Sequence, residues 1–167
     1  WRSAATIVTV TASDATSGVG DVRLYYRYAV DNSTWSAWTF YAVDNTAPYQ
    51  FVFAFGNGEG YYEIYSIATD VAGNAELAPG PADAKCALDT TDPTCSVTWA
   101  GPYWRNMSPL TVGVTSTDGL SGVDRVYFTY QFSADNITWG SWQAMNTDYT
   151  APYSDTLAWP NGNGYYR

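Results

Sequence analysis

The sequence contains no histidine, only two cysteines and few basic residues, and each shortage excludes a class of function. Without histidine, the chain lacks the commonest general base and the commonest zinc ligand. Seven basic residues against 16 acidic ones give a net charge of −9, which is the wrong sign for binding phosphate backbones or anionic lipid surfaces. We therefore expect a protein that is not an enzyme and that binds no nucleic acid.

Long hydrophobic runs are also missing. No run approaches the roughly 18 apolar residues of a membrane span, so we expect no membrane insertion in this segment. Hydrophobic residues nevertheless make up 46% of the chain and aromatic residues 17%, whereas charged residues are only 14%. Such a composition forms a hydrophobic core, which excludes a disordered chain.

A block of the sequence occurs twice with an offset of 104 residues, the difference between positions 35 and 139. The segments 14–19, 46–49 and 60–62 recur at 118–123, 150–153 and 164–166 without an insertion. Before residue 14 the offset becomes 103, because Trp1-Arg2 matches Trp104-Arg105, so one loop differs by a single residue. A period near one hundred residues fits a small domain copied in tandem.

The point at which each copy begins and ends relative to the other predicts the domain boundaries. It also predicts which strands each copy lacks. We expect domain 1 over residues 1–91, with its first strand upstream, and domain 2 over residues 92–167, without its last strands. Chain continuation or a neighbouring subunit would complete the second domain.

Strand patterns dominate the chain, and no apolar stripe of helical period lasts more than a turn. Side chains alternate between apolar and polar along residues 22–28, as in a half-buried strand. Gly, Pro, Asn and Asp interrupt the chain about every ten residues, as turns do. The sequence therefore predicts an all-β fold, with first-copy strands near residues 6–11, 22–28, 35–43, 49–55, 61–69 and 84–88.

Four separated motifs resemble the prokaryotic immunoglobulin-like repeats of archaeal and bacterial cell-surface proteins. The motifs are Asp14-x-x-Ser17-Gly18-Val19, Thr46-Ala47-Pro48-Tyr49, Gly60-x-Tyr62 and the run from Ser66 to Asn74. This resemblance implies tandem immunoglobulin-like β-sandwiches, a tyrosine corner at Gly60-x-Tyr62 and an extracellular location at the cell surface. Modules of this kind serve as spacers, adhesins, layer proteins and appendages of enzymes.

The two cysteines, Cys86 and Cys95, flank the predicted junction between the copies. Since no other thiol is present, a disulfide that spans the linker is the natural pairing in an oxidising compartment. The alternative is that they are two unrelated thiols that behave as small hydrophobic residues.

Three sequons, at Asn32, Asn106 and Asn136, are candidate glycosylation sites. Asn32 and Asn136 occupy the same repeat position, which we expect at the exposed tip of a hairpin. Asp-Asn is also favourable turn chemistry without a sugar, and this second interpretation stays open.

Asp14, Asp70 and Asn74 supply oxygen atoms that we expect in loops at one pole of the sandwich, where they could bind Ca²⁺. The number of carboxylates is low for calcium, and side-chain caps on backbone amides explain the same residues without a metal. We therefore favour capping and expect no required cofactor.

The tryptophans Trp35, Trp38, Trp139 and Trp142 are candidate contact residues on the repeated hairpin. We rank their roles as core packing first, packing between subunits second and stacking on glycans third.

These features together predict a structural segment of an extracellular surface assembly, such as a filament, stalk or surface layer. We expect it to associate with copies of itself through edge strands and exposed aromatic residues. The alternatives are a glycan-binding adhesin module and spacer domains of a larger surface enzyme.

Overall fold

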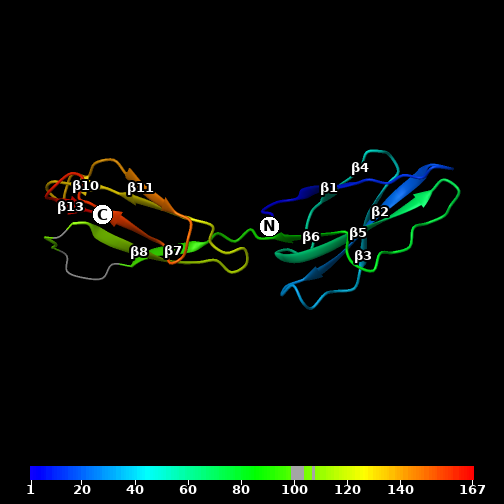
Figure 1. Ribbon diagram of the computed structural model, residues 1–167, viewed down its shortest axis with the longest axis horizontal. Coiled ribbons are helices and arrows are strands. Elements are labelled where there is room, and N and C mark those ends of the chain that lie inside the picture. Colours follow the sequence, from blue (N-terminus) through cyan, green and yellow to red (C-terminus); the bar gives the residue numbers. More distant parts are fainter. Residues whose placement is uncertain (99–103, 107) are drawn as a thin grey trace. The chain divides into compact units, whose positions relative to one another are not determined.

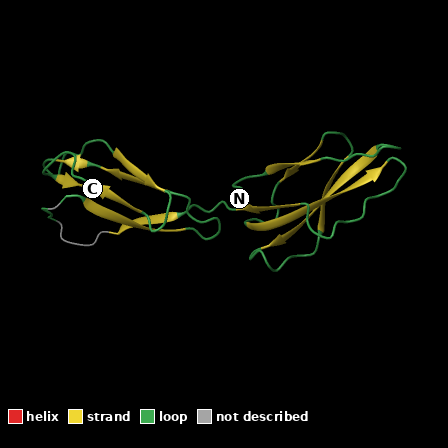
Figure 2. Ribbon diagram, viewed as in Figure 1, coloured by secondary structure: helices red, strands yellow, loops and turns green. Residues whose placement is uncertain are grey.

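The computed structural model of the protein describes residues 1–98, 104–106 and 108–167, and this part of the chain contains strands, turns and loops without a helix (Figures 1 and 2). The predicted all-β class is confirmed. The chain divides into two compact units, Trp1–Thr90 and Thr91–Arg167. Within the described ranges, no helix is long and apolar enough to cross a membrane.

The first unit is a sandwich of two antiparallel sheets (Figure 1). One sheet pairs β1 with β4, and the other has the strand order β3-β2-β5-β6. The strand predicted to start at Trp35 begins only at Thr39, and residues 35–38 form a loop. The bounds of the strands are β1 Thr6–Val10, β2 Val19–Ala29, β3 Thr39–Asp44, β4 Tyr49–Phe53, β5 Gly60–Asp70 and β6 Ala84–Leu88.

The core of the first unit lies between the two sheets and is rich in aromatic rings. On β4 the side chains of Tyr49, Phe51 and Phe53 are buried, whereas those of Gln50 and Val52 are exposed, which is the alternation of a strand with one buried face. Full burial of one such ring stabilises the fold by roughly 1.5–3 kcal/mol. The opposite sheet contributes Val22, Leu24, Tyr62 and Ile64 to the same cluster.

A tyrosine corner closes this core. The Tyr62 side chain is fully buried, and its hydroxyl donates a hydrogen bond to the carbonyl oxygen of Gly58 at 2.6 Å. In the second unit, the hydroxyl of Tyr166 donates to the carbonyl oxygen of Gly162 at 3.1 Å. The corner that the family resemblance implies is therefore present in both units.

The second unit repeats part of this arrangement, although β9, the counterpart of β2, has 5 residues in place of 11. Its sheets have the orders β12-β8-β7, β11-β9 and β10-β13. Its core cluster is smaller and centres on Val126, Phe128 and Tyr153. The bounds of its strands are β7 Thr94–Thr98, β8 Leu110–Thr117, β9 Val126–Tyr130, β10 Phe132–Ser133, β11 Gln143–Asp148, β12 Ser154–Leu157 and β13 Tyr165–Tyr166.

Strand pairing extends the repeat beyond what the motifs alone show. Thr6 pairs with Phe53 in the first unit, and Leu110 pairs with Leu157 in the second, so the 104-residue offset already holds at the start of β1 and β8. The one-residue difference between the copies therefore lies before Thr6.

Candidate functional site on the outer face of the four-stranded sheet

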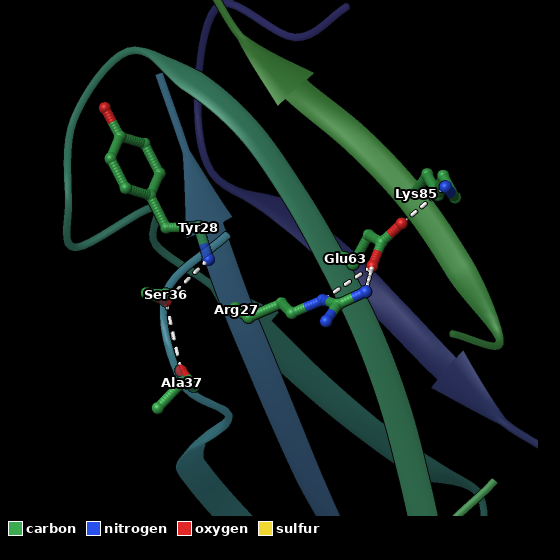
Figure 3. Close-up of polar contacts among 6 residues, drawn as sticks. All are labelled: Arg27, Tyr28, Ser36, Ala37, Glu63 and Lys85. Atoms are coloured by element: carbon green, nitrogen blue, oxygen red, sulfur yellow. Dashed lines mark hydrogen bonds and ion pairs between the residues drawn. The ribbon is translucent and has the colours of Figure 1, made fainter. Parts of the chain in front are cut away.

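Charged side chains from three neighbouring strands meet on the outward face of the four-stranded sheet. Arg27 of β2 pairs in register with Glu63 of β5, and Glu63 pairs with Lys85 of β6. Because side chains alternate along a strand, these three point away from the core that their neighbours fill. Figure 3 shows Arg27 and Lys85 reaching Glu63 from opposite sides.

Glu63 is the centre of this cluster and is only 3% exposed. Its Oε2 accepts a hydrogen bond from Arg27 Nε at 2.7 Å and lies 2.5 Å from Arg27 Nη2, while its Oε1 forms an ion pair with Lys85 Nζ. Burial by itself would raise the pKa of Glu63, but the hydrogen bonds and the charges of Lys85 and Arg27 lower it below its ordinary value. Glu63 is therefore a buried, ionised carboxylate with a cation on each oxygen.

An aromatic strip extends from the ion cluster, and we define it as Trp35, Trp38, Tyr65, Tyr25 and Phe40. The guanidinium carbon of Arg27 lies 5.2 Å from the ring centre of Trp35 and 4.7 Å from that of Trp38. Trp38 contacts Tyr65 edge-on at 4.4 Å, and Tyr65 stacks on Tyr25 at 5.0 Å. Tyr25 meets the half-exposed ring of Phe40 at 5.6 Å. A cation held over tryptophan contributes about 0.5–2 kcal/mol, depending on its desolvation.

The loop that carries both tryptophans is attached to β2 through Ser36. The backbone N–H of Ser36 donates to the carbonyl oxygen of Tyr28 at 2.8 Å, and the N–H of Tyr28 donates to Ser36 Oγ at 3.0 Å (Figure 3). The Ser36 hydroxyl also bonds to the carbonyl oxygen of Ala37 at 3.0 Å. These bonds hold Trp35 and Trp38 against the sheet on either side of Ser36.

The second unit has a related contact between an arginine and a tryptophan, but its arginine extends from the strand that corresponds to β5 and not from the one that corresponds to β2. Gln131 occupies the position of Arg27, and Arg167 occupies the position of Glu63. Arg167 Nε donates to Gln131 Oε1 at 2.7 Å, and its guanidinium carbon lies 4.2 Å from the ring centre of Trp139. Both units therefore place an arginine over the first tryptophan of the repeated pair.

The first-ranked role for the tryptophans, core packing, is wrong. Trp35, Trp38 and Trp139 are half-buried, and none belongs to the core clusters of the described residues. Trp142 is 59% exposed. The reason is that the predicted strand is a loop at these positions, and in the first unit this loop lies on the outside of the sheet.

Sequence analysis missed the cluster of Arg27, Glu63 and Lys85, because these residues lie on three strands that are distant in sequence. The available signal was Glu63, a single acid within the otherwise uncharged run Gly60–Thr69. An acid in such a strand is costly unless it is paired, and this predicts a basic partner on an adjacent strand.

Asp14 and Asp70 both cap the turns in which they lie. Asp14 Oδ1 accepts backbone hydrogen bonds from Thr16, Ser17 and Gly18 at 2.7–3.0 Å, and these bonds lower its pKa. Asp70 accepts bonds from the side chain and the backbone of Asn74 at 2.8 and 2.7 Å, which likewise lower its pKa. The three side chains line one surface cavity of about 420 Å³.

Within the described residues, no group of three or more His, Cys, Asp or Glu side chains could hold a metal ion. The oxygen Oδ1 of Asp14 accepts bonds from its own turn, and both oxygens of Asp70 accept bonds from Asn74. The observed contacts agree with capping, and calcium binding at Asp14, Asp70 and Asn74 stays an untested prediction.

The sequon asparagines lie on the surface. Asn32 and Asn136 are exposed, and both adopt left-handed backbone conformations, with φ of 57° and 60°. Asparagine adopts this backbone region more readily than most residues, so the shape of the turn by itself explains an asparagine at both positions. Asn106 is also exposed. Glycosylation at the three sites stays a prediction.

Cys86 and Cys95 are free thiols in this structure, and the disulfide between them stays a prediction. Cys86 lies partly buried on β6, and Cys95 is exposed on β7. Burial raises the pKa of the Cys86 thiol.

Comparison with known proteins gave one structural likeness. No family model matches the chain, and no curated protein matches it. Among solved structures, the fibronectin(III)-like modules of Clostridium thermocellum CbhA share 18% identity with this chain, with a TM-score of 0.42. The match covers 93% of this chain and 70% of that one.

Proposed function

We propose that this chain is a structural segment of an extracellular surface assembly, a filament, stalk or surface layer, and that it associates with copies of itself. The proposal rests on the structural roles of the residues that the two copies share. Apart from the tryptophans, which contact arginine on the outside, the repeated motifs with visible contacts support the backbone or the core.

The repeated aspartates illustrate this point. Asp118 caps its turn through Leu120 and Gly122, as Asp14 does in the first unit. Asp44 and Asp148 each accept two backbone hydrogen bonds around the Ala-Pro turns that follow them. A copied enzyme or receptor would preserve a pocket, whereas a copied scaffold preserves its turns and corners.

Exposed apolar side chains supply the contact surface that the proposal needs. Phe40 is 51% exposed at the end of the aromatic strip, and Val43 on the same strand is 47% exposed. In the second unit Tyr127 is 68% exposed. Scattered exposed residues are ordinary on a monomer, but rings at the edge of a sheet are suited to burial against another copy.

Sedimentation velocity over a concentration series, followed by electron microscopy of negatively stained samples, tests the proposal. We expect concentration-dependent association into fibres or layers, weakened by Phe40→Asp on β3. Val71→Asp, at a 69% exposed position in a turn, is the matched control and should leave association unchanged. A monomer at all concentrations would contradict the proposal.

A glycan-binding adhesin is the second candidate, and the exposure of Trp142 favours it. Trp38, its counterpart, is half-buried against Arg27 and Tyr65, whereas Gln131 replaces that arginine in the second unit. An open tryptophan face can stack on a sugar ring. Saturable quenching of tryptophan fluorescence by a glycan, abolished by Trp142→Ala and retained by Trp38→Ala, would support this function.

A further inference from the structure

Strand β7 lies at an edge of the sheet β12-β8-β7. All five of its residues pair with β8, from Thr94 opposite Thr117 to Thr98 opposite Gly113, and no bulge interrupts the ladder. In the part of the chain that the structure describes, no strand pairs with the other side of β7. That side presents backbone N–H and C=O groups to which a further strand can bind.

The later strands of a copy do not belong to this edge. In the first unit, β5 and β6 join β2 in the four-stranded sheet, whereas β1 and β4 form the other sheet. β1 and β4 are the counterparts of β8 and β12, to which β7 is attached. The open side of β7 is therefore independent of the strands that build the four-stranded sheet.

Other strand edges of the chain are closed by hydrogen bonds. On the free side of β6, the N–H of Arg2 donates to the carbonyl oxygen of Ala87 at 2.7 Å. Beside β4, Asp44 Oδ2 accepts from the N–H of Gln50 at 2.9 Å, and the equivalent aspartate caps β12 in the second unit. β1 has an open side too, but this is the side on which β7 lies against β8 in the second unit.

On β7, the side chains that could cover the edge contact β8 instead. The hydroxyl oxygen of Thr94 lies 3.0 Å from that of Thr117, and the hydroxyl oxygen of Thr98 lies 3.3 Å from that of Thr115. Both hydroxyls are thus engaged within the sheet. They leave the backbone groups on the open side of β7 accessible to another strand.

The charge of the chain favours this edge as a contact between copies. The net charge of −9 makes two copies repel each other. The sequence of β7 is Thr-Cys-Ser-Val-Thr, without a charged residue, whereas β3, β5, β6, β11 and β12 each carry at least one. Two β7 strands can therefore meet without bringing carboxylates together.

We propose that β7 pairs with β7 of a second copy, antiparallel about a two-fold axis at Ser96. Thr94 then lies opposite Thr98 of the second copy, Cys95 opposite Val97, and Ser96 opposite Ser96. This register pairs every residue of the strand and places hydroxyl side chains opposite one another on one face, which is favourable across antiparallel strands. Both copies use the same surface, as a two-fold contact requires. The sheets of the two copies become one continuous sheet.

This inference rests on the proposed self-association and names one of its contacts. Its first test is sedimentation velocity of the full chain and of Ser96→Lys over a concentration series. The substitution places two like charges opposite each other at the two-fold axis, and lysine is a residue by which natural edge strands prevent pairing. We expect the dissociation constant to rise by about tenfold or more. Thr111→Lys adds the same charge at an exposed position of the central strand β8 and should leave association unchanged.

Amide hydrogen exchange of the native chain is a second test, which needs no variant. In a concentrated solution, compared with a dilute one, exchange across Thr94–Thr98 should slow by about tenfold or more, since the pairing protects the backbone of β7. The amides of β2, in the middle of the four-stranded sheet, should exchange at the same rate in both solutions.

The outcomes separate this inference from the proposed function. Association that Phe40→Asp weakens and Ser96→Lys does not would overturn the pairing at β7 and leave the proposed self-association in place. Unchanged exchange across Thr94–Thr98 in an associated sample would also overturn the pairing. A chain that stays monomeric at all concentrations would overturn both proposals.

Discussion

The guanidinium carbon of Arg167 lies 4.2 Å from the ring centre of Trp139, although it extends from the strand position that carries Glu63 in the first unit. In the first unit the arginine over the matching tryptophan is Arg27, on the neighbouring strand. The repeat has therefore kept the contact between a cation and an indole ring while it exchanged the strand that provides the cation. A polar partner stays across the ladder in both cases, Glu63 in one and Gln131 in the other.

This exchange predicts that the two positions are energetically coupled. Arg27→Gln leaves the buried Glu63 with Lys85 alone, and Glu63→Arg brings three cations together. We expect each single change to lower the free energy of unfolding by about 2–3 kcal/mol, and the double variant to recover at least about 1 kcal/mol of the summed loss. Urea unfolding of the four proteins measures the coupling, and strictly additive losses would contradict it.

The ion cluster also predicts a dependence of stability on pH. Burial opposes ionisation of Glu63, but Lys85 and Arg27 lower its pKa below the ordinary value of 4.5. Because the folded pKa is the lower one, the stabilisation is complete above the ordinary carboxyl range and is lost as the pH falls through the folded pKa. The stability advantage of the native chain over Glu63→Gln should therefore shrink below about pH 4.5 in urea midpoints. Asp92→Asn, at an exposed position, should track the native chain.

The tyrosine corner predicts a loss of stability at high pH, whereas the ion cluster predicts one at low pH. Burial raises the pKa of Tyr62 to about 12, above the ordinary value of 10.0. Its contribution to stability is thus present at neutral pH and is lost as the pH rises from 10.0 through the folded pKa, since the unfolded chain ionises first. Tyr62→Phe should cost about 1 kcal/mol at neutral pH and should show a smaller alkaline loss. Tyr127→Phe, at a 68% exposed position, is the control.

Gly60 should tolerate no side chain. Its φ is +133°, and a Cβ would lie 2.8 Å from both the Ala29 carbonyl oxygen and the Tyr28 ring. We expect Gly60→Ala to destabilise the first unit by about 2–4 kcal/mol in thermal or urea unfolding. At Gly56, where a Cβ would meet nothing within 4 Å, the same replacement should change stability by less than about 1 kcal/mol. Equal effects at the two positions would contradict this account of the turn.

The cysteines predict a labelling result. Under reducing conditions, Cys95 should react rapidly with a thiol reagent, whereas Cys86 should react slowly because burial raises its pKa and shields it. Mass spectrometry after alkylation without reductant then tests the disulfide predicted from the sequence. Two alkylated thiols in natively produced protein would exclude that disulfide, and an unalkylated chain with a mass two hydrogen atoms below that of the reduced chain would establish it.

The sequence alone determined the all-β class, most strands of the first copy and the repeat, because these depend on local patterns, but it did not show that residues 35–38 form a loop. Alternation along residues 22–28 predicted the strand that the structure shows as β2, and the family resemblance at Gly60-x-Tyr62 implied the corner that Tyr62 makes with Gly58. The offset of 104 residues needed only the matching motifs, and strand pairing extended it to Thr6.

Only the tertiary structure decided which side chains meet on the outer face of the four-stranded sheet in the first unit. Arg27, Glu63 and Lys85 are distant in sequence, and period-two alternation tells which face a residue occupies but not which strand lies beside it. The tryptophans have the size and hydrophobicity of core residues, yet the loop at Ser36 carries Trp35 and Trp38 over Arg27. These contacts stabilise the fold because the buried carboxylate of Glu63 is paired with two cations and the guanidinium of Arg27 lies against two indole rings. Both arrangements depend on which strands are neighbours in the sheet.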